Sequence, residues 1–364
     1  MKRREFVGGL AAAAGLTACA QEHGDCSTGA AASGEMFEWS LVTSWSKKLP
    51  GIGMAPENLA TRIEAASGGR LKIKVYAGGE IVPPLEVFDA VSRGTVEMGH
   101  TASYYHKGKV DAAQFFTAIP FGLTNMELNG WLYYGDGLRL YRELYAPFNL
   151  MPFPTGNTGV QMGGWFNKEI NSIDDLKGLK MRIPGLGGEV LRRAGGTPIT
   201  LPGAEVFTAL QTGAIDATEW VGPYNDMSYG LHKAAKYYYY PGWQEPGPGL
   251  ETIVHQDAWD SLPADLQEIV NIACQAITTD MAAEYTHGNA ISLAQLQQDP
   301  SIGIRPFPDD VLALLKSITN EIVAELMAAD PASAKIGKAF FEYMDKVAAN
   351  SRISEEAYLT ARDL

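Results

Sequence analysis

Cysteine and basic residues are scarce in this 364-residue chain, and several catalytic spacings are missing. Its three cysteines, Cys19, Cys26 and Cys274, form no CxxC pair, so neither a disulfide framework nor a cysteine zinc cluster is predicted. HExxH and GxSxG motifs are missing too, which removes two common signatures of hydrolases. The 29 Lys and Arg residues against 42 Asp and Glu give a net charge of −13, which disfavours nucleic acid and anionic lipid surfaces as partners.

A long apolar run is also missing, because nothing approaches the about 18 consecutive apolar residues that suit a membrane-spanning helix. The chain instead starts with MKRREF and the short apolar run VGGLAAAAGL, a layout typical of a secretory signal. Arg3 and Arg4 also resemble the pair of a twin-arginine export signal. We therefore expect residues 1–18 to be a signal peptide.

The segment LTAC, Leu16–Cys19, resembles a bacterial lipoprotein box. Such a box implies that Cys19 is lipidated and that acyl chains anchor the body of the protein to a membrane. A plain signal peptide with an incidental cysteine is the alternative. Residues 19–36 are small, polar and aperiodic, which is typical of a flexible tether. The sequence thus predicts a periplasmic protein held at a membrane by its lipid alone.

An internal repeat divides the rest of the chain, whose length and 46% hydrophobic content fit two domains better than one. EVFDAVSRGTVEMGHTASYY, Glu86–Tyr105, aligns with EVFTALQTGAIDATEWVGPY, Glu205–Tyr224, at a constant offset. Each copy reads as an amphipathic helix, a glycine that closes it and a short strand, and strand patterns also precede the copies at Leu71 and Thr197. Chance similarity is the alternative, but the pattern predicts one βαβ unit in each of two lobes.

The stretch TEWVGPYND, Thr218–Asp226, ends the strand of the second copy on a carboxylate beside an indole. The repeat places Glu219 and Trp220 opposite His100 and Thr101, just past the carboxyl ends of their strands. Because ligands bind at that edge of open α/β sheets, two facing lobes would line one cleft with these residues. A solvated strand end is the alternative for Glu219.

Two further segments carry polar groups in or beside predicted strands. GNTGVQMGGWFNKEI, Gly156–Ile170, alternates like a strand and carries the amides of Asn157 and Gln161, which can bind a small polar ligand or a cation. LKGLKMRIPG places Arg182 at the end of an apolar strand, where a guanidinium can bind a carboxylate through two parallel hydrogen bonds. Amides that satisfy the local backbone, and an exposed strand-end charge, are the respective alternatives.

Taken together, these motifs closely resemble the solute-binding proteins of TRAP-type transporters. Within that family the chain looks most like the branch that binds 2-oxo monocarboxylates such as pyruvate, with a lactate-binding branch nearby. The resemblance runs from about Trp39 into the C-terminal helices and is carried by GNTGVQMGGWF, DLKGLKMRIPG, EVFTALQTGAIDATEWVGPYND and KYYYYPGW.

The resemblance implies an α/β fold, the two-lobed periplasmic binding protein fold, with a ligand cleft between the lobes and a helical C-terminal part. Residues 37–160 plus about 246–300 are then expected to form lobe one, and residues 161–245 lobe two. Residues 301–364 are expected to be helices that brace the lobes or form a dimer contact. Two crossings, at GVQMGGWF and YYYYPGW, are expected to join the lobes, which close by a hinge motion.

The resemblance also implies roles at matching positions. The ligand is expected to contact Arg182, which takes its carboxylate, and Asn157, Gln161, Tyr104, Trp220 and Trp243. A metal cation, Na⁺ or Ca²⁺, is expected on Gln161, Glu219, Glu245 and Trp220, the last through its backbone carbonyl. The partners implied are a small carboxylate and the membrane subunits of a TRAP transporter, with a homodimer left open.

Physical chemistry supports a cation independently of the resemblance. A ligand carboxylate that approaches Glu219 in a partly desolvated cleft meets like-charge repulsion, and Arg182 can neutralise only one of the two. A hard cation bound by carboxylate, amide and carbonyl oxygens removes that conflict. The missing His and Cys cluster argues against zinc.

Three other functions stay open on the sequence. A 2-hydroxy acid such as lactate can replace the 2-oxo acid as ligand. A periplasmic lipoprotein enzyme could use Glu219 as general base with His100 as partner, although no catalytic spacing is recognisable. A purely structural envelope lipoprotein would bind no small carboxylate at all.

Overall fold

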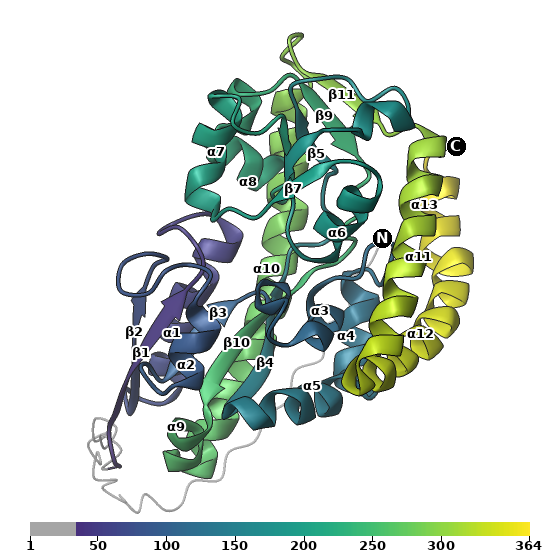
Figure 1. Ribbon diagram of the computed structural model, residues 1–364. Coiled ribbons are helices and arrows are strands. Elements are labelled where there is room, and N and C mark those ends of the chain that lie inside the picture. Colours follow the sequence, from purple (N-terminus) through teal and green to yellow (C-terminus); the bar gives the residue numbers. More distant parts are fainter. Residues whose placement is uncertain (1–33) are drawn as a thin grey trace, which may run out of the picture. The chain divides into compact units, whose positions relative to one another are not determined.

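The computed structural model describes residues 34–364. The predicted signal peptide, the lipidation site Cys19 and nearly all of the predicted tether lie outside the described residues. Within the described range the strands form two sheets of mixed direction (Figure 1).

The first sheet has five strands in the order β2-β1-β3-β10-β4. Its three N-terminal strands run parallel, and β10 lies antiparallel to both of its neighbours. The strands are β1 (Phe37–Thr43), β2 (Leu71–Tyr76), β3 (Met98–Thr101), β4 (Leu150–Asn157) and β10 (Gly249–His255). The helices of these segments are α1 (Ala55–Ala66), α2 (Val87–Ser92), α3 (Gln114–Thr117), α4 (Asn125–Tyr134), α5 (Gly137–Tyr145) and α9 (Gln256–Ser261).

The second sheet has six strands in the order β11-β9-β5-β8-β6-β7. The strands are β5 (Gly164–Phe166), β6 (Lys180–Arg182), β7 (Thr197–Ile199), β8 (Ala217–Thr218), β9 (Tyr237–Tyr240) and β11 (Gly303–Pro306). The helices between them are α6 (Gly185–Arg193), α7 (Gly203–Gln211) and α8 (Pro223–Ser228). Strand β11 lies within the segment for which the sequence predicted only helices, and it pairs with β9 at the edge of this sheet.

The repeat is confirmed as two helix–strand units, one for each sheet. In the first copy α2 leads to β3, and in the second α7 leads to β8. Gly94 and Gly213 stand at equivalent positions with φ of 68° and 74°, the left-handed conformation that closes a helix. The preceding strands β2 and β7 also lie where the sequence placed them. One sequence pattern therefore gives the same local structure in both halves.

The strand predicted at GVQMGGWF is shorter than expected, because only Gly164–Phe166 pairs with neighbouring strands. Gly164 has φ of 115°, and a Cβ atom there would lie 2.3 Å from the carbonyl oxygen of Thr218. A side chain at this position would separate β5 from β8, so the glycine allows the close approach of the two strands.

Within residues 34–364 the chain crosses between the sheets three times rather than twice. The segments between β4 and β5 and between β9 and β10 are the two crossings that the sequence predicted. The third is α10 (Ala264–Leu296), which contacts α1 and β4 of the first half and α8 of the second, and then leads to β11 (Figure 1). A helix that packs on both halves connects them through a rigid element as well as through two loops.

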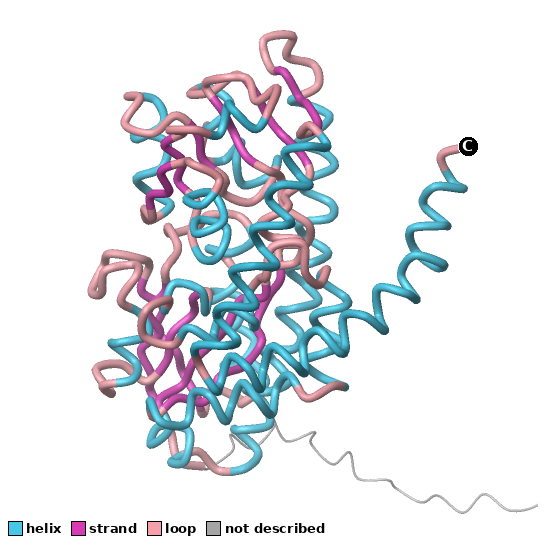
Figure 2. The backbone as a smooth tube through the Cα atoms, turned by 45° about the vertical axis from the view of Figure 1, so that its right-hand side comes forward, coloured by secondary structure: helices cyan, strands magenta, loops and turns pink. Residues whose placement is uncertain are grey.

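The C-terminal helices also contact both halves. Helix α11 (Asp309–Ala329) packs on α6, where Arg193 pairs with Glu325, and α12 (Pro331–Ser351) packs on α5, where Lys335 pairs with Glu143. A π-helical turn (Arg352–Glu356) and α13 (Ala357–Arg362) then extend away from the two sheets (Figure 2). Helices α11 and α12 thus contact elements of both halves, and a bracing role for them stays a prediction.

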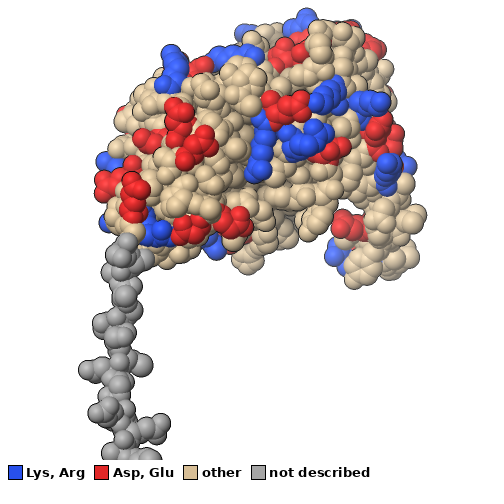
Figure 3. All heavy atoms as spheres, turned by 90° about the horizontal axis from the view of Figure 1, so that it is seen from below, with Lys and Arg blue, Asp and Glu red and all other residues tan. Residues whose placement is uncertain are grey.

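Two surface properties of the described residues bear on function. None of the helices formed by residues 34–364 is both long and apolar enough to cross a bilayer. On the face drawn in Figure 3, basic and acidic side chains are interspersed and form no extended basic track. That pattern agrees with the net charge of −13.

Candidate functional site

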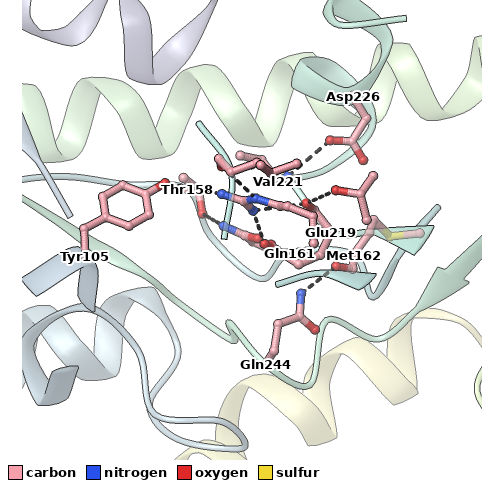
Figure 4. A network of polar contacts seen from close by, with 11 residues as sticks. Tyr105, Thr158, Gln161, Met162, Glu219, Val221, Asp226 and Gln244 are labelled. Atoms are coloured by element: carbon pink, nitrogen blue, oxygen red, sulfur yellow. Dashed lines mark hydrogen bonds and ion pairs between the residues drawn. The ribbon is translucent and has the colours of Figure 1, made fainter. Parts of the chain in front are cut away.

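A small cavity lies where residues of the two halves meet. Its volume is about 20 Å³, room for one or two water molecules. Its lining is apolar in one part, with Trp45, Ile52, Val221, Pro248 and Leu250, and polar in the other, with Tyr104, Tyr105, Thr158, Gln161, Arg182 and Glu245, while Trp220 contributes an indole. Figure 4 shows Thr158, Gln161 and Glu219 close to one another.

Arg182 is the centre of the polar part. It ends β6, is 1% exposed, and its guanidinium pairs with the carboxylate of Glu219, which follows β8 and is completely buried. Arg182 Nη1 also donates to the Glu219 carbonyl oxygen at 3.2 Å, and its guanidinium stacks over the Trp220 ring at 4.9 Å from the centroid. From the other half, the Tyr105 hydroxyl lies 3.4 Å from Arg182 Nη2.

A second buried carboxylate, Glu245, lies on the crossing between β9 and β10 and is 3% exposed. Burial and the nearby Glu219 carboxylate raise the pKa of Glu245 well above its ordinary value. Burial likewise raises the pKa of Glu219 to about 7, although the Arg182 guanidinium opposes that rise. Burial alone would lower the pKa of Arg182, but Glu219 and the other nearby acidic groups outweigh it, so the guanidinium stays charged. Two carboxylates facing one guanidinium leave this site short of positive charge.

Several oxygens around Arg182 have no hydrogen-bond partner among residues 34–364. They are Gln161 Oε1, Glu219 Oε2, Glu245 Oε2 and Gln244 Oε1. Buried acceptors are normally paired, because an unpaired one costs about 1–3 kcal/mol. Carboxylate and amide oxygens are the donor set that Na⁺ and Ca²⁺ prefer, so the residues present fit a hard cation.

The described residues hold no cluster of three or more His, Cys, Asp or Glu side chains that could bind a metal. A cation here must therefore rely on amide and carbonyl oxygens beside the two carboxylates. That donor set is suited to Na⁺ or Ca²⁺ and unsuited to zinc, which prefers nitrogen and sulfur.

Two of the predicted ligand contacts do not line this cavity. The Asn157 amide donates to the Gly247 carbonyl at 2.9 Å and accepts from the Gly159 N–H at 2.9 Å, so it holds the two loop crossings together. Trp243 is 5% exposed and stacks on Phe121, with ring centroids 5.9 Å apart. Neither side chain lines the cavity in this structure, and their contact with a ligand stays a prediction.

Sequence reasoning did not name several residues that line the cavity, among them Trp45, Thr158 and Tyr105. Trp45 lines it from the first half, and its indole N–H donates to His100 Nδ1 at 2.7 Å. His100 Nε2 in turn donates to the Thr155 carbonyl at 2.9 Å, so the ring is neutral and holds the indole in place. Thr158 and Tyr105 lie directly beside predicted residues, Asn157 and Tyr104, and that adjacency was the signal that could have found them.

Comparison with known proteins places this geometry in a family. Residues 41–330 match the bacterial extracellular solute-binding proteins, family 7, also called DctP. This chain belongs to that family. A relative from Nostoc sp., a monocarboxylate 2-oxoacid-binding periplasmic protein, is 43% identical over 361 residues, which is 98% of each chain.

Two solved structures share the fold closely. A TRAP periplasmic solute-binding protein from Pseudoalteromonas atlantica, with bound sodium and pyruvate, has a TM-score of 0.87 and 45% identity, covering 90% of this chain and 99% of that one. Another from Colwellia psychrerythraea, with bound calcium and pyruvate, has a TM-score of 0.87 and 43% identity, covering 90% of this chain and 100% of that one. These matches confirm the resemblance to TRAP solute-binding proteins and the two-lobed α/β fold.

Proposed function

We propose that this protein captures a small 2-oxo monocarboxylate such as pyruvate, together with Na⁺ or Ca²⁺, between its two sheets. The observation that carries the proposal is the set of oxygens around Arg182 that have no hydrogen-bond partner among residues 34–364, two of which, on Gln161 and Glu245, belong to residues that line the cavity. The cation binds those oxygens and the ligand carboxylate binds the guanidinium. The two related structures that hold pyruvate with sodium or calcium support this pairing of ligand and ion.

Each predicted residue has a role in this proposal. The cation takes oxygens from Gln161, Glu219, Glu245 and the Trp220 carbonyl. The ligand carboxylate binds Arg182, with Tyr104 as a further donor and Asn157, Trp220 and Trp243 at the walls. Because Arg182 is already paired with Glu219, cation binding at Glu219 releases the guanidinium for the ligand. Cation and ligand therefore bind as linked species.

The cavity favours a ligand with a short tail. Its volume of about 20 Å³ is small, and its apolar part, which includes Trp45, Ile52 and Leu250, offers no partner for a second charged group. The second carboxylate of a dicarboxylate would be buried without a partner. The free energy that this costs is larger than the free energy gained by burying a methyl group in its place. The lactate-type alternative differs only in replacing the 2-oxo group by a hydroxyl.

Delivery of the ligand to the membrane subunits of a TRAP transporter follows from this function. The protein works in the periplasm, and we propose that a lipid on Cys19 holds it at a membrane. Fractionation of cells followed by mass spectrometry of the mature N-terminus tests the anchor. Cys19→Ala should move the protein from the membrane fraction to the soluble periplasmic fraction, and a wild-type protein that is already soluble would remove the anchor from the proposal.

A homodimer through the C-terminal helix is the second partner that we propose. The last turns expose large apolar side chains, with Ile353 81% and Tyr358 65% exposed, and Leu359 lies in a groove that also contains Met126 and Val160. A second copy of the chain would cover these groups. Light scattering should give a dimer mass for the mature protein and a monomer after deletion of residues 352–364, whereas a wild-type monomer at micromolar concentration would overturn this part.

A thermal-shift screen tests the ligand and the cation together. Carboxylates of two to six carbons are added to metal-stripped protein with Na⁺, with Ca²⁺ or with a bulky organic cation. A ligand at 100 times its Kd adds about 2.7 kcal/mol of stability, which gives a clear rise in Tm. We expect 2-oxo monocarboxylates to raise the Tm only when Na⁺ or Ca²⁺ is present. A rise in Tm of the same size without either ion would contradict the proposal.

The enzyme alternative is tested by following the ligand. Pyruvate or lactate is incubated with excess protein and the solution is analysed for products. We expect full recovery of the unchanged ligand, as in a solute-binding protein. Catalytic consumption would overturn the binding function.

A further inference from the structure

Asp226, the last residue of the TEWVGPYND stretch, is a buried carboxylate that does not line the cavity. It lies in α8 and is completely buried. Its Oδ2 accepts hydrogen bonds from Trp165 Nε1 at 3.0 Å and from the Tyr238 hydroxyl at 2.7 Å, and its Oδ1 accepts from the Val221 N–H at 3.2 Å. The contact between Asp226 and Val221 is drawn in Figure 4.

All three partners are donors, and that explains why the residue is an aspartate. A carboxylate offers only acceptors, so both of its oxygens match what surrounds them. An asparagine of the same shape would direct an NH₂ group at one of the donors and leave it unsatisfied. Trp165 and Tyr238 belong to adjacent strands, β5 and β9, and their rings stack with centroids 4.1 Å apart. Asp226 thus connects the segment after β8 to the middle of the second sheet.

The bond to Val221 determines the direction of a carbonyl group. The Val221 N–H and the Trp220 C=O belong to one peptide unit, which is planar and trans, so the two groups point in opposite directions. An acceptor fixed on the N–H side therefore directs the Trp220 oxygen away from Asp226. A hydrogen bond to the N–H also polarises the peptide, which makes its oxygen a better acceptor.

The carbonyl oxygens on either side of Trp220 already accept hydrogen bonds, whereas that of Trp220 does not. The Glu219 oxygen accepts from Arg182 Nη1 at 3.2 Å and from Thr218 Oγ1 at 2.8 Å, and the Val221 oxygen accepts from the Met162 N–H at 2.9 Å. The Trp220 oxygen accepts no backbone hydrogen bond from residues 34–364 outside the regular helices and strands. Of three consecutive carbonyls, the middle one is left with its lone pairs available.

We propose that Asp226 is a positioning residue for the cation: by holding the Val221 N–H it keeps the Trp220 carbonyl directed and polarised as a ligand. The proposal rests on the proposed function, because it assigns the support of one oxygen in the same site. Asp226 itself does not touch the cation. Its effect passes through the peptide unit between Trp220 and Val221.

The first experiment compares Asp226→Asn with wild-type protein in a cation titration. Metal-stripped protein receives Na⁺ or Ca²⁺ alone, and the Tm is followed as a function of ion concentration. The cation concentration at which the Tm has risen halfway, the cation midpoint, should be about 10- to 100-fold higher for the variant than for wild type. That is the usual effect of removing a group that holds a metal ligand in place. Pyruvate affinity should fall at low cation concentration and return towards the wild-type value when the cation saturates.

A matched control is Asp330→Asn, at a residue that does not line the cavity. Asp330 also accepts backbone N–H groups, those of Ala332 and Ser333, at the start of α12. Its variant should lower the Tm without changing the cation midpoint. A cation midpoint for Asp226→Asn equal to that of wild type would make Asp226 structural only and overturn the proposal.

A measurement on the wild-type protein covers the case in which Asp226→Asn does not fold. With the Trp220 carbonyl carbon labelled by ¹³C, addition of Na⁺ or Ca²⁺ should shift its NMR resonance, while the labelled carbonyl of Trp243 stays unchanged. A Trp220 resonance that ignores a cation known from the Tm to bind would overturn the inference alone. A wild-type protein whose Tm ignores both ions would instead overturn the cation in the proposed function.

Discussion

Two clusters of buried carboxylates differ in how completely their oxygens are used. Glu251 on β10 is 1% exposed and accepts from His106 Nε2 at 2.8 Å, from the Tyr145 hydroxyl at 3.4 Å and from the Tyr141 hydroxyl, so both of its oxygens have partners. Beside Arg182, Glu219 and Glu245 each keep one oxygen that has no hydrogen-bond partner among residues 34–364.

The difference separates a structural carboxylate from a binding one. Both clusters remove carboxylates from water, which costs free energy unless hydrogen bonds or charges compensate. The Glu251 cluster obtains that compensation from the chain itself. The cavity cluster leaves it incomplete, so a cation and an anion that supply the missing contacts bind favourably. Three predictions test this comparison, and a fourth concerns the acid sensitivity of a buried histidine beside the cavity.

The largest effect is expected at Arg182. Arg182→Ala should lower pyruvate affinity by about 100-fold or more, because two charge-assisted hydrogen bonds, each contributing about 1.5–3 kcal/mol, are lost. Arg182→Lys should also weaken binding, since an ammonium cannot make two parallel bonds to a carboxylate. Calorimetry measures both, with Arg192→Ala, an exposed arginine paired to Glu189, as control. Unchanged affinity in Arg182→Ala would remove this residue from the site.

Glu219→Gln is expected to weaken binding about 10-fold, with partial recovery in excess cation. The variant keeps the shape and one oxygen but removes the charge that holds the cation. If Glu219 merely faced the ligand, loss of its charge would relieve repulsion and tighten binding instead. Calorimetry at low and high Ca²⁺ distinguishes the two, and tighter binding would contradict the shared cation.

Glu251→Gln should have the opposite profile, with lower stability and unchanged binding. The amide directs an NH₂ group at a site built from donors, which should cost about 1–3 kcal/mol of unfolding free energy. Ligand affinity and the cation midpoint should stay at the wild-type values, because no group of this cluster lines the cavity. Urea unfolding measures the change in stability and calorimetry the change in ligand and cation affinity. A changed cation affinity in Glu251→Gln would show that the two clusters are not functionally distinct.

The smallest effect is a pH dependence at His100. Burial lowers the pKa of His100 to about 4, below the usual value of about 6.5 for an exposed histidine. Its stabilising contribution is therefore fully present above about pH 6.5 and is lost as the pH falls through about 4. Urea unfolding between pH 7.5 and 4 should show a smaller decline in His100→Gln than in wild type. An equal decline would mean that other groups cause the acid sensitivity.

Local features of the fold could be predicted from the sequence because they follow from short-range rules. The βαβ pattern of both copies, their closing glycines and the end of a strand at Arg182 depend on periodicity and on backbone conformation. The third crossing by α10 and the strand β11 could not be found in this way. Both depend on how a long helix packs on two distant sheets, which no short pattern encodes.

The candidate site divides along the same line. The residue types of Glu219, Gln161 and Arg182, and the strand-end positions of Glu219 and Arg182, were visible in the sequence. The structure alone shows that Arg182 pairs with Glu219 and meets Tyr105, which is 77 positions away in the chain. It also shows that Asn157 donates to the Gly247 carbonyl and that Trp243 stacks on Phe121, outside the lining of the cavity.

The sequence by itself determined the kind of chemistry available: an acidic chain with one guanidinium, two carboxylates and an amide in motifs typical of carboxylate-binding proteins. Only the tertiary structure decided which oxygens find partners within the chain and which stay available for a cation. The physical reason is that satisfaction of a buried polar atom depends on every group that surrounds it in space, and most of those groups come from remote segments.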